Sequence, residues 1–244
     1  TDSPQTTAPH LRALDAADAR SGALGEQLEA LEMIRKAVGP NTPIIWTVFS
    51  PLMVLPFLLA GGRAQAVAVM RAEPTALEHA LDAMAVTLED YARAAVESGA
   101  DGLFYATNMA TRELSTAVEC RRFQRPYDLR ILGRVESSPF NMLHVCGAGV
   151  LFDEFADYPA TALSWATMPG NPTLSDAHRR TGRAVVGGLP AKPEIAGLPP
   201  AEVEARARRA IGEMGGRFLL LGPDCSINPD TPDAVMDAAT AATR

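Results

Sequence analysis

The sequence has few cysteines and little positive charge. Its 244 residues contain three cysteines, Cys120, Cys146 and Cys225, which cannot all form disulfides within one chain. In an acidic, enzyme-like chain we interpret them as reduced thiols, which predicts a cytoplasmic location. The net charge is −7 and no basic stripe is visible, so we expect no nucleic-acid partner.

Long hydrophobic runs are also missing. The longest apolar run, residues 51–60, is interrupted by Pro56 and is much shorter than the roughly 18–20 residues that a membrane span needs. The first residues lack the basic and hydrophobic segments of a signal peptide. We therefore expect no membrane partner, a disordered segment over residues 1–8, and a single domain over residues 9–244.

Short apolar strands and helical segments alternate along the chain. Strands are predicted at residues 43–49, 103–106, 140–145, 161–165, 184–186 and 217–221, with helices between them, including long ones over 10–38, 75–97 and 201–214. This alternation is typical of a parallel α/β sheet. It leaves open whether the sheet is doubly wound or is a (βα)8 barrel without two of its units. No phosphate-binding glycine motif follows the first strand, which argues against the usual nucleotide-binding form of a doubly wound sheet.

Two of the predicted strands end in good metal ligands. His144 and Cys146 come at the end of strand 140–145, and Cys225 follows strand 217–221. Residues 144 and 146 lie on one side of an extended segment, and function collects where parallel strands end. Imidazole and thiolate are preferred zinc ligands, and three of them leave the fourth position open, as in catalytic sites. The alternative is that the cysteines are small buried hydrophobic side chains, as we infer for Cys120.

Other polar and aromatic residues at predicted strand ends are candidates for lining the mouth of the sheet. Substrate-binding candidates are Tyr105, Asn108, Ser164, Trp165 and Asp224. For each of them, an ordinary place in a loop or in the core is the alternative interpretation.

From about Leu11 to its end, the chain resembles the uroporphyrinogen decarboxylase superfamily. The likeness rests on several short motifs in family order: Ser-Pro-Leu at 50–52, Glu-Ser-Gly-Ala-Asp-Gly-Leu at 97–103, His-Val-Cys-Gly at 144–147, Leu-Ser-Trp at 163–165, Val-Gly-Gly at 186–188 and Gly-Pro-Asp-Cys at 222–225. The resemblance implies a (βα)8 TIM-type barrel with its site at the C-terminal mouth. It also implies that the first two βα units of that barrel have no counterpart here.

The superfamily has two branches, and the residues favour one of them. The true decarboxylases of porphyrin biosynthesis carry a tyrosine, a histidine and an Asp-Trp pair where this chain has Phe57, no histidine at 223–225, and Ser164-Trp165. The zinc-dependent methyltransferases pass methyl groups between a corrinoid protein and a thiol, and carry His-x-Cys with a distant Cys as zinc ligands. Residues 144, 146 and 225 match that pattern.

The resemblance therefore implies a methyltransferase with one Zn²⁺, a small-molecule thiol substrate and a corrinoid protein as partner. A homodimer is one possible assembly. Two alternatives stay open at this point. The first is uroporphyrinogen decarboxylase activity. The second is a partial barrel without enzymatic activity that binds a metal or a partner protein.

Overall fold

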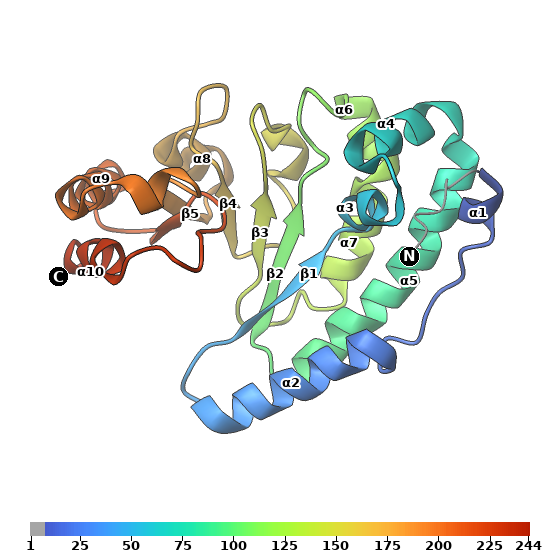
Figure 1. Ribbon diagram of the computed structural model, residues 1–244, viewed down its shortest axis with the longest axis horizontal. Helices are drawn as coiled ribbons and strands as arrows, with labels where there is room; N and C mark the ends of the chain where they lie inside the picture. Colours follow the sequence, from blue (N-terminus) through green and yellow to red (C-terminus); the bar gives the residue numbers. More distant parts are fainter. Residues whose placement is uncertain (1–7) are drawn as a thin grey trace.

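The computed structural model describes residues 8–244 and contains one parallel sheet (Figure 1). Its strands are β1 (Ile45–Phe49), β2 (Gly102–Thr107), β3 (Met142–Val145), β4 (Ala162–Trp165), β5 (Ala184–Leu189) and β6 (Leu219–Pro223). Each strand pairs in parallel with the next strand along the chain, so β1 and β6 are the edges of the sheet. A doubly wound sheet reverses its strand order, whereas a barrel wall does not. The TIM-barrel-like fold expected from the resemblance is therefore confirmed.

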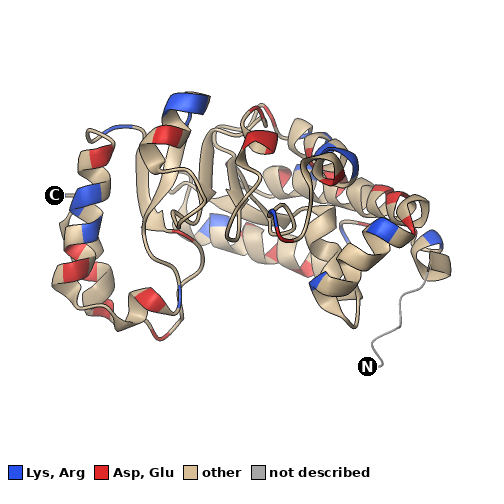
Figure 2. Ribbon diagram, turned by 90° about the horizontal axis from the view of Figure 1, so that it is seen from above, with Lys and Arg blue, Asp and Glu red and all other residues tan. Residues whose placement is uncertain are grey.

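Helices connect the strands. They are α1 (Ala8–Arg12), α2 (Gly22–Val38), α3 (Pro51–Val54), α4 (Gly62–Ala72), α5 (Pro74–Glu97), α6 (Ala117–Phe123), α7 (Arg125–Gly133), α8 (Leu174–Thr181), α9 (Pro200–Glu213) and α10 (Asp233–Ala241), with 3-10 turns at Leu55–Leu58, Phe152–Phe155 and Glu194–Gly197. In Figure 1, α2, α5 and α7 lie beside β1 to β3, and α9 and α10 lie beyond β5 at the other end of the sheet. In Figure 2, basic residues are interspersed with acidic residues along the helices.

The two faces of the sheet differ because side chains alternate along each strand. On β2 and β3, Leu103, Tyr105, Leu143 and Val145 are buried in the main core, which also contains residues of α2, α5 and α7. The alternate residues form a second, smaller cluster on the opposite face, which holds Met142 of β3, Ala162 of β4 and Val186 of β5, with Phe104 and other partly buried residues packed against them. This opposite face, which we call the inner face, carries His144.

The start of β3 is fixed against β2 by close backbone contact. Gly102 has φ +152°, and a Cβ atom on it would lie 1.9 Å from the carbonyl oxygen of Phe140, so only glycine fits there. The side chain of Asn141 completes the junction. Its Oδ1 accepts a hydrogen bond from the Leu103 N–H at 2.9 Å, and its Nδ2 donates to the Val135 carbonyl at 2.8 Å. The register that brings His144 to the sheet end follows from this junction.

Two helix predictions were wrong. The helix expected over residues 10–38 is divided into α1 and α2, because Asp18 Oδ1 accepts a hydrogen bond from the Arg20 N–H and Gly22 takes a positive φ of 53°. Helix α4 was not predicted at all. It begins at Gly62, in a Gly61-Gly62 pair that is as typical of a helix end as of a helix start.

The domain prediction, with a disordered segment over 1–8 and one domain over 9–244, stays a prediction. Residues 1–7 lie outside the described part of the chain, and Ala8 already belongs to α1. Within residues 8–244, no single helix is both long and apolar enough to cross a membrane. One pair, Pro51–Leu58 with Gly62–Ala72, passes that test only when joined across a bend of 112°.

Candidate metal centre

His144 lies on β3 and is almost completely buried. Its register partners are Ala106 on β2 and Ser164 on β4. The imidazole stacks on the Phe104 ring, with centroids 5.4 Å apart and an angle of 24° between the planes. Its Nδ1 lies 3.0 Å from Ser164 Oγ, while its Nε2 is buried without a hydrogen-bond partner among the described residues. A buried imidazole nitrogen without a partner is costly, so this atom is a candidate ligand.

Cys146 follows β3 directly. Its backbone N–H donates to the Thr107 carbonyl at 2.8 Å, which continues the pairing of β2 and β3 for one more residue. The Thr107 hydroxyl accepts a hydrogen bond at 2.6 Å from Gln124, in the connection between α6 and α7. The residue that accepts the Cys146 N–H is therefore itself fixed by a buried polar contact.

Cys225 comes from the far edge of the sheet. Two hydrogen bonds fix the turn that carries it, one to the end of β5, from the Asp224 N–H to the Leu189 carbonyl at 2.8 Å, and one from the segment after β5, from the Lys192 N–H to the Ser226 carbonyl at 3.0 Å. The sheet brings Cys225 to Cys146 although β4 and β5 lie between their strands. The Sγ atoms of Cys146 and Cys225 are 3.6 Å apart, and the ligand atoms of His144, Cys146 and Cys225 all lie within 4.8 Å of one another.

The donor set fits Zn²⁺. One imidazole nitrogen and two thiolates are ligands that zinc prefers, and three protein ligands leave one position open. The orphaned Nε2 of His144 supports this interpretation, because a hydrogen bond of Nδ1–H to Ser164 Oγ leaves the lone pair on Nε2. Both cysteines are free of disulfides. The sequence predicted all three residues as ligands, and the structure brings them together; that they bind a metal remains a prediction.

The two thiols of the cluster titrate as a pair. The pKa of Cys225 is lowered to about 3, first because the Cys146 thiol donates a hydrogen bond to it and second because His144 lies beside it. The pKa of Cys146 is raised, because it holds the shared proton and because burial disfavours its thiolate. The lowered pKa of Cys225 favours its thiolate, which is the form that binds a cation.

Three of the five predicted substrate-binding residues lie near this cluster. Ser164 contacts His144 directly. Asn108 lines a cavity of about 360 Å³ that Cys146 also lines. Asp224 binds the loop after β4, accepting a hydrogen bond from the Thr167 N–H at 2.8 Å, and burial raises its pKa. Asp224 also lines a larger cavity of about 910 Å³ between the loops after β4 and β5 and helix α9.

The other two predicted residues do not reach the inner face. Tyr105 is fully buried on the helix side of β2, where its hydroxyl donates to Asp128 Oδ1 at 2.6 Å. Trp165 is fully buried on the helix side of β4, where its indole N–H donates to the Pro172 carbonyl at 3.0 Å and its ring packs edge-on against Phe152. Both side chains stabilise the outer layer and contribute no surface to the candidate site.

Sequence reasoning missed several residues around the cluster. Arg63 and Glu113 line the 360 Å³ cavity from the start of α4 and from the loop after β2. Asn171 fixes the loop after β3, since its Oδ1 accepts from the Val150 N–H at 2.8 Å and its Nδ2 donates to the Gly147 carbonyl at 3.0 Å. No sequence signal marks these loop residues. They become visible only once the strand ends are placed in space.

Residues 1–244 match the family model described as "Uroporphyrinogen decarboxylase (URO-D)". The chain therefore belongs to the uroporphyrinogen decarboxylase family. Its relatives include both methyltransferases and decarboxylases. The chain is 26% identical over 243 residues to the methylcobamide:CoM methyltransferase MtaA of Methanosarcina barkeri, an alignment that covers 97% of this chain and 70% of the relative. It is 25% identical over 221 residues to the uroporphyrinogen decarboxylase of Edwardsiella ictaluri, covering 86% of this chain and 60% of the relative.

Solved structures agree with the fold. A methyltransferase from Methanosarcina mazei superimposes with a TM-score of 0.78 and 25% identity, covering 94% of this chain and 69% of the other. A B12-independent methionine synthase from Shewanella sp. W3-18-1 superimposes with a TM-score of 0.62 and 15% identity, covering 88% and 64%, which shows a shared fold only. The chain thus spans between 60% and 70% of the length of these relatives.

Proposed function

We propose that this chain is a zinc-dependent methyltransferase that activates a substrate thiol as a thiolate and methylates it. The observation that carries the proposal is the convergence of His144, Cys146 and Cys225 within 4.8 Å at one end of the sheet. The methyltransferase relatives support the same reaction class. A small-molecule thiol and a methyl-corrinoid protein are the proposed substrate and partner.

The three ligands have distinct tasks in this proposal. His144 would bind through Nε2, with its tautomer set by Ser164, and Cys146 and Cys225 would bind as thiolates. A bound Zn²⁺ would supply Lewis acidity at its open position, which lowers the pKa of a thiol there. The negative charge of the two cysteine ligands offsets the charge of the ion, so that the substrate sulfur stays nucleophilic.

The transfer step balances without any further reactant. The substrate thiol loses its proton to solvent, and its sulfur attacks the methyl carbon. The new S–C bond would form as the methyl group leaves a corrinoid donor, and that donor would keep the electron pair of the broken carbon–cobalt bond. The Phe104 ring, which stacks on His144 on the inner face, shields one side of the imidazole from water.

Metal analysis of the purified protein tests the proposal. We expect about one zinc per chain, and its loss in both Cys146→Ser and Cys225→Ser. Cys120→Ala is the matched control, because Cys120 is buried on α6 away from the cluster and should leave the zinc content unchanged. A protein that transfers methyl groups to thiols without bound metal would contradict the proposal.

Uroporphyrinogen decarboxylation is the second candidate, because decarboxylases are also among the relatives. In the superfamily's true decarboxylases that reaction needs neither a metal nor thiols. Decarboxylation would therefore not explain why His144, Cys146 and Cys225 cluster. Incubation with uroporphyrinogen distinguishes the two. Formation of coproporphyrinogen at equal rates in the parent protein and in Cys225→Ser would favour the decarboxylase. The non-enzymatic alternative, a metal- or partner-binding subunit, predicts zinc binding without turnover of either substrate.

A further inference from the structure

The cavity beside Cys146 has the size and position of a pocket for a small thiol. Its volume of about 360 Å³ is at the lower end of the range of roughly 300–1,000 Å³ that is usual for small-molecule sites. Its wall is formed by the first turn of α4, the loop after β2 and the loop after β3. Because Cys146 lines it, a molecule whose sulfur lies at the metal position can extend its other end into this cavity. The inference below rests on the proposed function.

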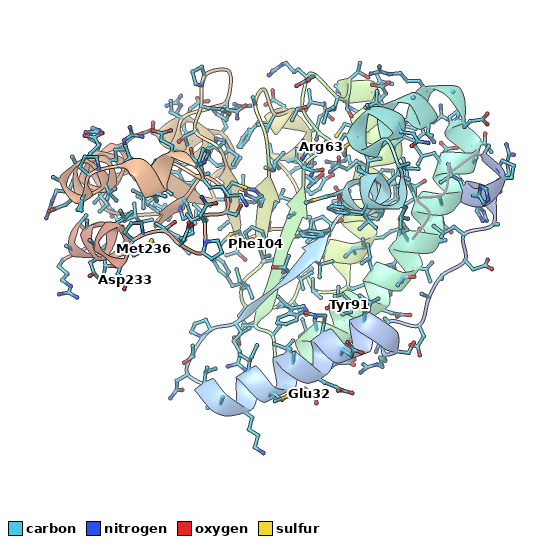
Figure 3. The ribbon with its side chains drawn as sticks, viewed as in Figure 1. Glu32, Arg63, Tyr91, Phe104, Asp233 and Met236 are labelled. Carbon is cyan, nitrogen blue, oxygen red and sulfur yellow. The ribbon has the colours of Figure 1, made fainter. Side chains whose placement is uncertain are left out.

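The cavity contains one positive and one negative side chain, and neither is neutralised. Arg63 and Glu113 both line it, and neither takes part in an ion pair or a side-chain hydrogen bond within residues 8–244. Figure 3 labels Arg63 at the start of α4, close to the upper ends of the central strands. Most other arginines in the described chain pair with a carboxylate, as Arg121 does with Glu154 and Arg125 with Asp157. Two unpaired opposite charges in one small pocket are therefore unusual here.

One further feature reinforces the positive region of the cavity, and another reinforces its acceptor region. The helix α4 begins at the cavity, with Arg63 and Ala64 in its first turn, so the positive end of its dipole lies on the same side as the guanidinium group. Asn108 contributes an acceptor, because its Oδ1 atom is buried and has no hydrogen-bond partner among the described residues. The cavity thus presents a cationic donor region at α4 and an acceptor region formed by Glu113 and Asn108.

We propose that the thiol substrate is a small α-amino acid, a zwitterion whose carboxylate binds Arg63 and the start of α4 and whose ammonium group binds Glu113 and Asn108 Oδ1. A ligand with a carboxylate and an ammonium group satisfies both regions at once. A purely anionic thiol would leave Glu113 facing a like charge and Asn108 Oδ1 without a donor. A purely cationic thiol would leave the guanidinium group of Arg63 unpaired.

Calorimetric measurement of binding to the zinc-loaded protein tests the proposal, with three small thiols of different charge type. They are L-homocysteine (zwitterion), 2-mercaptoethanesulfonate (anion) and 2-mercaptoethylamine (cation), which also differ in size and in the kind of acid group. We expect L-homocysteine to bind most tightly, by about tenfold or more over each of the others. Equal or tighter binding of 2-mercaptoethanesulfonate would overturn the proposal, and so would equal or tighter binding of the cation.

For charge-neutral variants, the proposal predicts the direction of the change in thiol affinity as well as its magnitude. Arg63→Gln should weaken L-homocysteine by about tenfold. Glu113→Gln should weaken L-homocysteine while strengthening 2-mercaptoethanesulfonate, because the repelling carboxylate is gone. The matched controls are Arg112→Gln and Glu136→Gln, two exposed residues outside the cavity, which should change neither affinity. If Glu113→Gln weakens both thiols alike, or if the controls act like the cavity variants, the proposed pocket is wrong.

The inference and the proposed function can fail separately. The zinc-free protein should still bind L-methionine, the S-methylated product of L-homocysteine, with the same sensitivity to Arg63→Gln, because the amino-acid end of the ligand needs no metal. If the protein binds zinc but binds the anionic thiol more tightly than L-homocysteine, the amino-acid pocket is refuted and the proposed metal centre is unaffected. Binding of L-methionine by a protein that takes up no zinc when zinc is supplied would refute the metal centre and support the pocket.

Discussion

Removal of the Ser164 hydroxyl should weaken zinc binding without unfolding the protein. Ser164 Oγ lies 3.0 Å from His144 Nδ1, and both residues are 4% exposed, so no bulk water replaces a lost hydroxyl. In Ser164→Ala the Nδ1–H loses its acceptor inside the site, and an unsatisfied buried donor costs about 1–3 kcal/mol. If that cost falls on the metal-bound form, the Kd for zinc rises by roughly 5- to 150-fold.

The assay is a competition for zinc against a chelator of known affinity, run on the parent, on Ser164→Ala and on Ser137→Ala. Ser137 is exposed and makes no side-chain hydrogen bond among the described contacts, so its variant should bind zinc like the parent. The register of β3 and β4 places residues 144 and 164 directly opposite one another. An unchanged zinc affinity in a folded Ser164→Ala would refute the assignment of Nε2 as the ligand atom.

Three further predictions concern the scaffold. Thr116→Ala removes one half of the capping box that Thr116 forms with Glu119 at the start of α6; we expect a loss of about 1 kcal/mol in a denaturant titration and no change in zinc content. Burial raises the pKa of Asp128 to about 7, so the folded state holds a proton that the unfolded state has lost above about pH 4; stability should fall as the pH rises from about 4 towards 7, and a parallel curve for Asp128→Asn would contradict this. Asn171→Ala breaks the hydrogen bonds that hold the loop at Gly147, which should speed amide exchange there and weaken zinc; equal exchange rates would show that the loop holds without them.

The strands could be predicted from the sequence because each one is a short apolar run that ends where the pattern changes. The three candidate ligands could be predicted for the same reason, since His144, Cys146 and Cys225 stand where two of those runs end. The helix α4 could not, because Gly61-Gly62 is typical of a helix end as well as of a start. Because α4 was not predicted, Arg63 in its first turn was not recognised as a candidate site residue.

Strand register decides which of the candidate mouth-lining residues reach the inner face. Tyr105 pairs with Leu143, and Trp165 pairs with Val145, so both face the helices. Ser164 pairs with His144 and shares its face. Period-two alternation from His144 would have given this result, but only with the register between strands, which depends on distant contacts such as those of Asn141. The loop residues Glu113 and Asn171 depend on tertiary packing alone.

X-ray absorption at the zinc edge tests the metal centre most directly. In the zinc-loaded protein we predict two sulfur ligands at about 2.3 Å and light-atom ligands that include one imidazole. Addition of a substrate thiol should raise the sulfur count from two to three, because the thiol takes the open position. A spectrum without sulfur ligands, or one with two sulfurs that no thiol changes, would contradict the proposed site of His144, Cys146 and Cys225.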